Sequence, residues 1–180
     1  DTTVTEGWAP NLQLCRERLA PLGIRVCAVE EDLRLPLTDD SFDLVINRQE
    51  SYDLNEVWRV LKPGGWFITQ QVGGRNCVDL AARLNREPLP PAEPFSSDTE
   101  RPRFISRGFE VTRAEECFLR LSFYDVGAVV FWARQIPWSF PGFSVDNNLQ
   151  QLLEIKREMQ EQKCVSAIQH RFLLVGKKPK

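Results

Sequence analysis

The sequence predicts an α/β domain with an open, doubly wound and mostly parallel sheet. Apolar, β-prone residues over 42–46 and 66–69 indicate two buried strands, and a short helical pattern followed by a Gly-Gly turn separates them. Strand and helix patterns also alternate every roughly 15 to 25 residues from residue 1 to 86, which is typical of βαβ units. Sheets of this kind bind ligands at the carboxyl ends of their strands.

The elements of the first half follow from local patterns. The β-prone residues over 3–5 and 24–29 predict two strands. Asn11 is expected to cap the helix between them, which ends at Leu19. Asp53 followed by Glu56 resembles a capping box that begins a short helix. The Pro-Gly-Gly sequence after Lys62 ends that helix, and a further helix is expected over 76–86.

The second half changes in character. Five prolines between Pro88 and Arg103 predict a loop or extended insertion, which is a candidate lid or substrate-binding segment. The elements expected after it are strands at 109–111 and 118–123, a helix over 126–136 that is buried all round and opened by Asp125, a helix capped by Asp146, and a strand at 171–176. We divide the chain into a cofactor-binding part, 1–86, and an insertion with a substrate-side part, 87–180.

Composition excludes several classes of protein. A net charge of −2 gives no basic surface for nucleic acid, and no apolar run reaches the roughly 20 residues that a membrane helix needs. The five scattered cysteines and the one histidine, His170, do not have the spacing of a metal cluster, so we expect no metal site. The start lacks the basic and apolar stretches of a signal peptide, and we expect a cytoplasmic protein with reduced, mostly buried thiols.

Polar residues follow three successive predicted strands. Glu6 follows the first, Glu31 and Asp32 the second, and Asn47 and Arg48 the third. A carboxylate at a strand end can accept hydrogen bonds from both hydroxyls of a ribose, and a second acid one strand away can accept one from an adenine amino group. The repetition predicts an adenosine-bearing cofactor lying across the strand ends.

The chain also resembles a known family through Glu31-Asp32-Leu33-Arg34-Leu35-Pro36-Leu37, Asp39-Asp40-Ser41-Phe42-Asp43 and Leu61-Lys62-Pro63-Gly64-Gly65. In this order and spacing, these motifs resemble the class I S-adenosylmethionine-dependent methyltransferases, of the small-molecule type 11 kind. The resemblance covers residues 1 to about 75 and implies a Rossmann-like fold. It implies a transferase that uses S-adenosyl-L-methionine and a small-molecule acceptor.

The resemblance also implies roles for residues. Glu6 would bind the ribose hydroxyls with Gly7 and Trp8 beside the adenine, Glu31 or Asp32 would meet the adenine amino group, and the backbone near Leu33 would meet the ring. Asn47 and Arg48 would lie where the methionine portion of the cofactor meets the substrate, although Arg48 could instead bind an acidic substrate or pair with Glu50. Glu50 is the candidate base, with Gln49 and Tyr52 orienting the acceptor.

One family feature is absent. The glycine-rich loop that follows the family's first strand has no counterpart here, and Gly73-Gly74 comes too late in the chain. The loop, its strand and its helix would together be missing, and the strand would lie between those ending at Glu6 and Asn47. Three explanations stay open: a retained part of a longer protein, a naturally truncated product completed by rearrangement or a partner chain, or a wrong alignment of the start.

Two other functions compete with methyl transfer. The first is a truncated, non-catalytic methyltransferase-like domain that acts as a binding or dimerisation module, and the absent glycine loop favours it. A homodimer through the open sheet edge is the expected assembly. The second is a nicotinamide dinucleotide enzyme, which also places an acid after its second strand. That enzyme too needs a glycine loop, and it does not account for Leu61-Lys62-Pro63-Gly64-Gly65.

Overall fold

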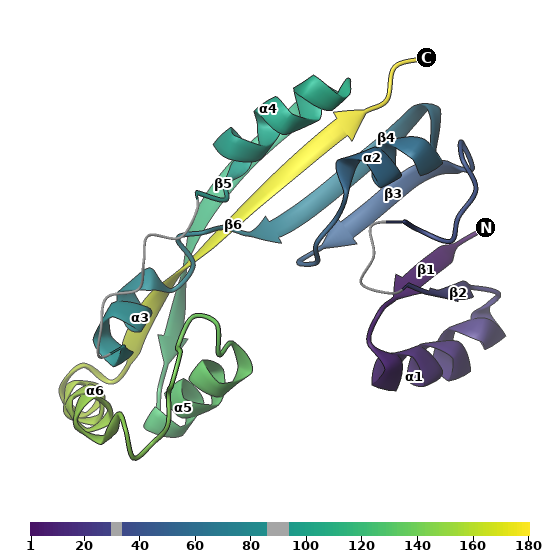
Figure 1. Cartoon of the computed structure of the whole chain (residues 1–180). Coiled ribbons are helices and arrows are strands. Elements are labelled where there is room, and N and C mark those ends of the chain that lie inside the picture. Colours follow the sequence, from purple (N-terminus) through teal and green to yellow (C-terminus); the bar gives the residue numbers. More distant parts are fainter. Residues whose placement is uncertain (30–33, 86–93) are drawn as a thin grey trace.

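A computed structural model describes residues 1–29, 34–85 and 94–180 (Figure 1). The elements are, in order, β1 Thr3–Glu6, α1 Ala9–Leu19, a 3₁₀ turn Ala20–Leu22, β2 Arg25–Ala28, β3 Phe42–Arg48, α2 Leu54–Val60, β4 Leu61–Val72, α3 Val78–Leu84, α4 Ser97–Arg107, β5 Glu110–Phe123, α5 Val126–Gln135, α6 Leu149–Gln162 and β6 Val165–Lys177. The predicted α/β class is confirmed.

The strands form two separate sheets. β1 and β2 pair in parallel, and the second sheet has the order β3-β4-β6-β5. In that sheet β3 and β4 are parallel, whereas β6 runs antiparallel to both β4 and β5. The predicted parallel strands are therefore present in the first half, and the second half adds an antiparallel pair.

The two sheets present unpaired edges. Within the described residues, β1 pairs only with β2 and β3 pairs only with β4, so one side of each has no strand partner. The segment 1–29 has no buried residue, and its hydrogen bonds with described residues stay within the segment. The β1-α1-β2 segment lies beyond β3 in Figure 1. Whether a strand is missing between β1 and β3 stays a prediction.

Two hydrophobic cores hold the rest of the chain. In the first core, α2 and α4 pack on the sheet, with Phe104 lying in parallel against Phe67 at 5.4 Å between ring centres. The second core lies where α3, α5 and α6 pack against the far ends of β5 and β6. Every second residue of β6 is buried, and the buried set shifts by one position between Ala167 and His170. The strand passes from one core to the other at this point. β5 and β6 therefore link the cores.

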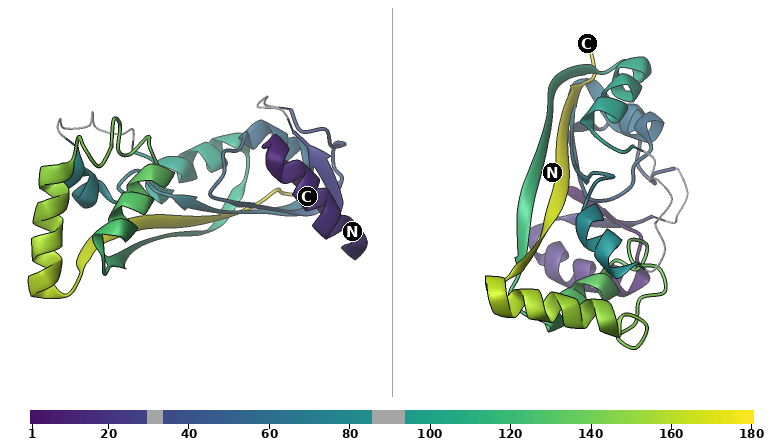
Figure 2. Two further views of the ribbon diagram at one scale, coloured as in Figure 1. Left: turned by 90° about the horizontal axis from the view of Figure 1, so that it is seen from below. Right: turned by 90° about the vertical axis from the view of Figure 1, so that its left-hand side faces the viewer.

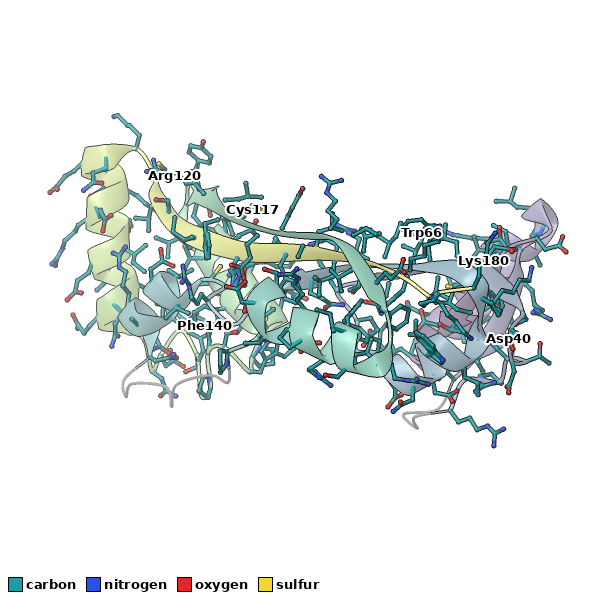
Figure 3. The ribbon with its side chains drawn as sticks, turned by 90° about the horizontal axis from the view of Figure 1, so that it is seen from above. Asp40, Trp66, Cys117, Arg120, Phe140 and Lys180 are labelled. Atoms are coloured by element: carbon teal, nitrogen blue, oxygen red, sulfur yellow. The ribbon has the colours of Figure 1, made fainter. Side chains whose placement is uncertain are left out.

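Among the described residues, no helix covers the other face of the four-stranded sheet over β3 and β4. α2 and α4 lie on one side (Figure 2), and the apolar side chains of Leu44, Ile46 and Trp66 point to the opposite side with exposed fractions of 46%, 68% and 36%. Figure 3 shows Trp66 and Cys117 on the side away from α4. Of the five cysteines, all free, only Cys77 is buried, so the expectation of mostly buried thiols is wrong.

The predicted loop over 88–103 is wrong for its last part, because α4 begins at Ser97 and includes Pro102. Ser96 and Thr99 form a reciprocal capping box, which satisfies the first backbone N–H groups of the helix. Burial of Phe104 adds the tertiary contact that overrides the proline. The prolines at 88, 90 and 91 lie outside the described residues.

Four other features differ from expectation: the starts of two helices, the extent of one strand and the burial of one helix. α1 begins at Ala9 rather than being capped by Asn11, and α6 is preceded by Asn148 rather than by Asp146. The strands expected at 109–111 and 118–123 are one strand, β5, because its whole length pairs with β6. α5 buries only Val129 and Ala133, so it is not buried all round; Asp125 does cap it.

Candidate functional site

The carboxyl ends of β3 and β4 are joined by a buried polar network. Asn47 Oδ1 accepts hydrogen bonds from Thr69 Oγ1 at 2.9 Å and Gln71 Nε2 at 2.5 Å. Gln71 Nε2 also donates to the backbone carbonyl of Glu50 at 3.0 Å. Thr69 and Gln71 are buried. Because the two strands are parallel, their ends meet at one sheet edge, and this network fixes the turn that leaves it.

The residues after Asn47 turn sharply. Gln49 has a φ of +57°, in the left-handed region, and its N–H donates to the Gln70 carbonyl at 2.8 Å. Arg48 Nε donates to Gln70 Oε1 at 3.2 Å. The exposed Glu50 Oε1 accepts from the N–H of Ser51 at 2.9 Å. Arg48, Gln49 and Glu50 therefore cluster at the sheet edge, and the Glu50 carboxylate faces solvent.

Tyr52 lies apart from this edge. Its ring packs against Phe67 and Phe104, and its hydroxyl donates to Glu100 Oε2 at 2.9 Å. Burial raises the pKa of the Tyr52 phenol well above its usual range, and the Glu100 carboxylate raises it further. The phenol stays protonated at neutral pH, with its proton directed at Glu100 in α4.

The acid after β1 is held at the start of α1. Glu6 Oε1 accepts from the N–H of Trp8 at 2.8 Å, and Glu6 Oε2 lies 4.0 Å from Cys15 Sγ. Gly7 is close to β2, since a Cβ there would lie 3.4 Å from the Val29 carbonyl oxygen. Trp8 is exposed. The Oε2 atom of Glu6 therefore keeps acceptor capacity for a ligand hydroxyl.

The predicted site residues form two groups. Glu6, Gly7 and Trp8 lie at the end of β1, whereas Asn47 and its successors lie at the end of β3, in the other sheet. Within the described residues no hydrogen bond joins the two groups. Glu31, Asp32 and Leu33 lie outside the described residues.

Sequence reasoning missed two polar pairs, each with one buried member. His170 is buried on β6, and its Nε2 lies 2.9 Å from Glu116 Oε1 on β5, while its Nδ1 accepts from the N–H of Arg75. Glu100, also buried, accepts from Tyr52. No local signal could reveal either pair, because both depend on the register of β5 with β6 or on the placement of α4.

Neither a metal cluster nor a membrane span is found in the part of the chain that the structure describes. No three His, Cys, Asp or Glu side chains there could hold a metal ion. No described helix is both long and apolar enough to cross a bilayer.

Comparison with known proteins gives a family match over part of the chain and a shared fold. Residues 1–69 match the family described as "Methyltransferase domain". No curated protein shows significant similarity to the chain. The resemblance seen in the sequence is thus confirmed for the first 69 residues, which hold β1 through most of β4.

Solved structures match nearly the whole chain. A Bacillus halodurans protein assigned as a methyltransferase has a TM-score of 0.63 and 16% identity, with 99% of this chain and 83% of that chain covered. The YcgJ protein of Bacillus subtilis has a TM-score of 0.60 and 18% identity, with coverages of 99% and 82%. A geranyl diphosphate methyltransferase in complex with S-adenosylmethionine has a TM-score of 0.52 and 12% identity, with coverages of 98% and 68%. At these identities the likeness shows a shared fold.

Proposed function

We propose that this chain serves S-adenosylmethionine-dependent methyl transfer to a small-molecule acceptor, with the cofactor lying across the carboxyl ends of β1 and β3. The family match over residues 1–69 and the fold shared with methyltransferases support a transferase of this class. The observation that carries the proposal is the Glu6 carboxylate at the end of β1. One of its oxygens accepts from the Trp8 N–H, and the other has only a long, 4.0 Å contact from the Cys15 thiol and can accept further hydrogen bonds.

In this proposal the two groups of site residues bind different parts of the cofactor. Glu6 Oε2 accepts from the ribose hydroxyls, and Gly7 and Trp8 flank the adenine. Glu31 or Asp32 meets the adenine amino group and the Leu33 backbone the ring. Asn47 and Arg48 face the methionine portion at the end of β3.

The bound sulfonium would supply an activated methyl group, and the protein's part is positioning. The acceptor would attack that methyl carbon in line with the carbon–sulfur bond, which would break, so the chain's residues would have to hold the two reactants in that line. An acceptor that must lose a proton needs a base, and Glu50 is the proposed one because its carboxylate is exposed at the sheet edge. Gln49 and Tyr52 are the proposed residues that orient the acceptor. For this role the Tyr52 hydroxyl must first break its hydrogen bond to Glu100.

The methionine end of the cofactor needs donors that the described residues do not provide between β1 and β3. We propose that an extended segment fills this gap as a strand parallel to both. Support comes from the unpaired edges of the two strands and from the absence of buried residues in 1–29. A longer gene product, a rearranged segment of this chain or a partner chain would each supply it.

Transfer of an isotopic label tests this function. The chain is incubated with methyl-labelled S-adenosylmethionine and the small molecules that copurify with it, and products are read by mass spectrometry. We expect label in one small molecule and at least about tenfold slower labelling at subsaturating cofactor for Glu6→Ala, the loss of one charged hydrogen bond. Glu17→Ala, on the exposed side of α1, is the control. Absence of labelled product would contradict the proposal.

The second candidate, a non-catalytic binding or dimerisation module, is favoured by the unpaired edge of β3 and the exposed Leu44 and Ile46 beside it. It predicts a dimer in sedimentation experiments. Ile46→Lys places a charge on that edge strand at little folding cost, because the side chain is exposed, and should yield a monomer. A chain that is monomeric without any substitution would remove this candidate.

A further inference from the structure

A pocket of about 420 Å³ lies between α2 and α4, and its lining includes Tyr52 and Asp53, which lead into α2. Five of its lining side chains can donate hydrogen bonds: Tyr52, whose hydroxyl donates to Glu100, Asn55 from α2, and Arg103, Ser106 and Arg107 from α4. Arg103 and Arg107 are four residues apart, so one face of α4 presents both guanidinium groups. The pocket wall is therefore rich in donors and in positive charge.

Arg107 is a cation without an acidic partner among the described residues. Its guanidinium carbon lies 4.7 Å from the ring centre of Trp58, and its Nε is buried without a hydrogen-bond acceptor. Buried donors in folded proteins are nearly always paired, with a side chain, water or a ligand. Arg107 is thus a positively charged donor group whose acceptor has still to be identified.

The platform under Arg107 is rigid. Trp58 packs edge-on against Phe109 at 4.9 Å between ring centres, and Lys178 Nζ lies 5.2 Å from the Trp58 ring centre. Gly108 has a φ of +111°, and a Cβ at that position would come within 2.9 Å of the Trp58 ring. The end of α4 therefore lies directly on the indole. This contact orients the guanidinium before any ligand binds.

Each of the two carboxylates near the pocket has at least one oxygen engaged in hydrogen bonds. Glu100 Oε1 accepts from Arg103 Nη1 at 2.7 Å, and its other oxygen accepts from Tyr52. Asp53 Oδ1 accepts from the N–H groups of Asn55 and Glu56 at the start of α2. Arg103 uses only one of its nitrogens on Glu100, and its side chain is 63% exposed. Both arginines therefore retain donors for a ligand.

We propose that the α2–α4 pocket binds an oxyanion, the carboxylate or phosphate group of a small molecule, with Arg107 as its principal cation. Arg103, Asn55 and Ser106 supply further donors around it. A planar guanidinium held on an aromatic ring suits the bidentate recognition of such a group. This site goes beyond the proposed cofactor site, because none of its residues is a proposed cofactor ligand. Tyr52, a proposed orienting residue for the acceptor, is in its lining with its hydroxyl on Glu100.

Titration calorimetry with inorganic phosphate and, separately, with succinate tests the site on the full chain. We expect saturable one-to-one binding of at least one of the two anions. The anion that binds more tightly shows whether the site prefers a phosphate or a carboxylate group. Arg107→Gln should weaken it by about tenfold or more, as expected for a charged hydrogen bond. Arg101→Gln, exposed on the same helix and outside the pocket lining, should bind as the unsubstituted chain does.

A second variant guards against a folding defect in Arg107→Gln. Asn55→Asp adds a negative charge at the pocket wall and should also weaken anion binding, while the thermal unfolding midpoint stays within a few degrees. Weaker binding in either folded variant supports the site. The proposal is overturned if neither anion binds saturably at millimolar concentration, or if the folded variants bind as the unsubstituted chain does.

Discussion

At the residue scale, Arg59 is the side chain that ties the segment before β3 to α2. Its Nη1 donates to the Leu37 carbonyl and to Asp39, and its Nη2 donates to the Leu35 carbonyl at 3.0 Å. Nε and Nη2 also donate to Glu56, at 2.8 and 2.6 Å. One guanidinium thus satisfies two backbone carbonyls and two carboxylates beside the candidate site.

Arg59→Ala should lower the free energy of unfolding by about 2–3 kcal/mol, because charged hydrogen bonds to half-buried partners are lost together. Urea denaturation measures the change. Lys62→Ala is the matched control, since its ion pair with Asp43 is exposed and should contribute far less. Equal losses in the two variants would contradict this role for Arg59.

Stability at acid pH should depend on Glu56. The side-chain hydrogen bond from Arg59, with that of the Leu35 N–H and the Arg59 charge, lowers the pKa of Glu56 below the usual 4.5. The stabilisation that ionised Glu56 gives the folded state is therefore fully present above pH 4.5. It is lost as the pH falls through the lowered pKa of Glu56 in the folded state. We expect Glu56→Gln to flatten the pH dependence of the urea midpoint below pH 4.5, whereas the exposed Glu154→Gln should leave it unchanged.

Single residues were predictable where the signal is local. Asp53 and Asp125 each accept N–H groups at a helix start, as expected for N-caps. The capping box expected at Asp53 is incomplete, because the Glu56 carboxylate turns to Arg59 and Leu35. Tertiary partners of this kind, like His170 with Glu116, leave no trace in a local pattern.

At the scale of elements, α4 shows how tertiary contacts override a local rule. Pro102 lies inside the helix, where it cannot donate to the carbonyl four residues earlier. The capping box at Ser96 and the packing of Phe104 into the first core sustain the helix. A proline-rich composition predicted a loop because composition carries no information about these contacts.

Pro102→Ala should therefore raise the free energy of unfolding by about 1–3 kcal/mol, since it restores a backbone hydrogen bond to the interior of α4. Urea denaturation of the full chain measures it. Ala133→Gly, in the buried face of α5, is the control and should lower the free energy of unfolding. A Pro102→Ala chain less stable than the unsubstituted one would show that the proline fits α4 without strain.

β5 and β6 show the limit of periodicity at the same scale. Their alternation is clear only where one face is buried, and the charged middle of β5 hides the strand in the sequence. The pairing of Glu110 through Phe123 with β6 depends on residues far apart in the chain. Local patterns therefore predicted strands at both ends of β5 but did not predict that they form one continuous strand.

At the scale of the whole molecule, stability should be uneven. Residues 1–29 lack a buried residue, whereas β4 and β6 lie between β3 and β5 and bury most of one face. Hydrogen exchange read by mass spectrometry should find the amides of β1 and β2 exchanging far faster than those of β4 and β6. Addition of S-adenosylhomocysteine should slow exchange in β1. Equal protection in both sheets would mean that the gap beside β3 is filled.

The parallel first half and the acid at the end of β1 were predictable because βαβ units have a regular period and polar residues mark the strand ends. The arrangement of two hydrophobic cores could not be predicted from the sequence, because it depends on how β5 and β6 extend from one core to the other. The division at residue 86 stays a prediction: α3 packs in the second core and α4 in the first.

The measurement that tests the central claim most directly is a calorimetric titration of the 180-residue chain with S-adenosylhomocysteine. The proposal predicts saturable one-to-one binding that Glu6→Ala weakens by about tenfold or more and that Glu17→Ala leaves unchanged. No heat at millimolar ligand, or binding that Glu6→Ala does not affect, would contradict a cofactor site at the end of β1.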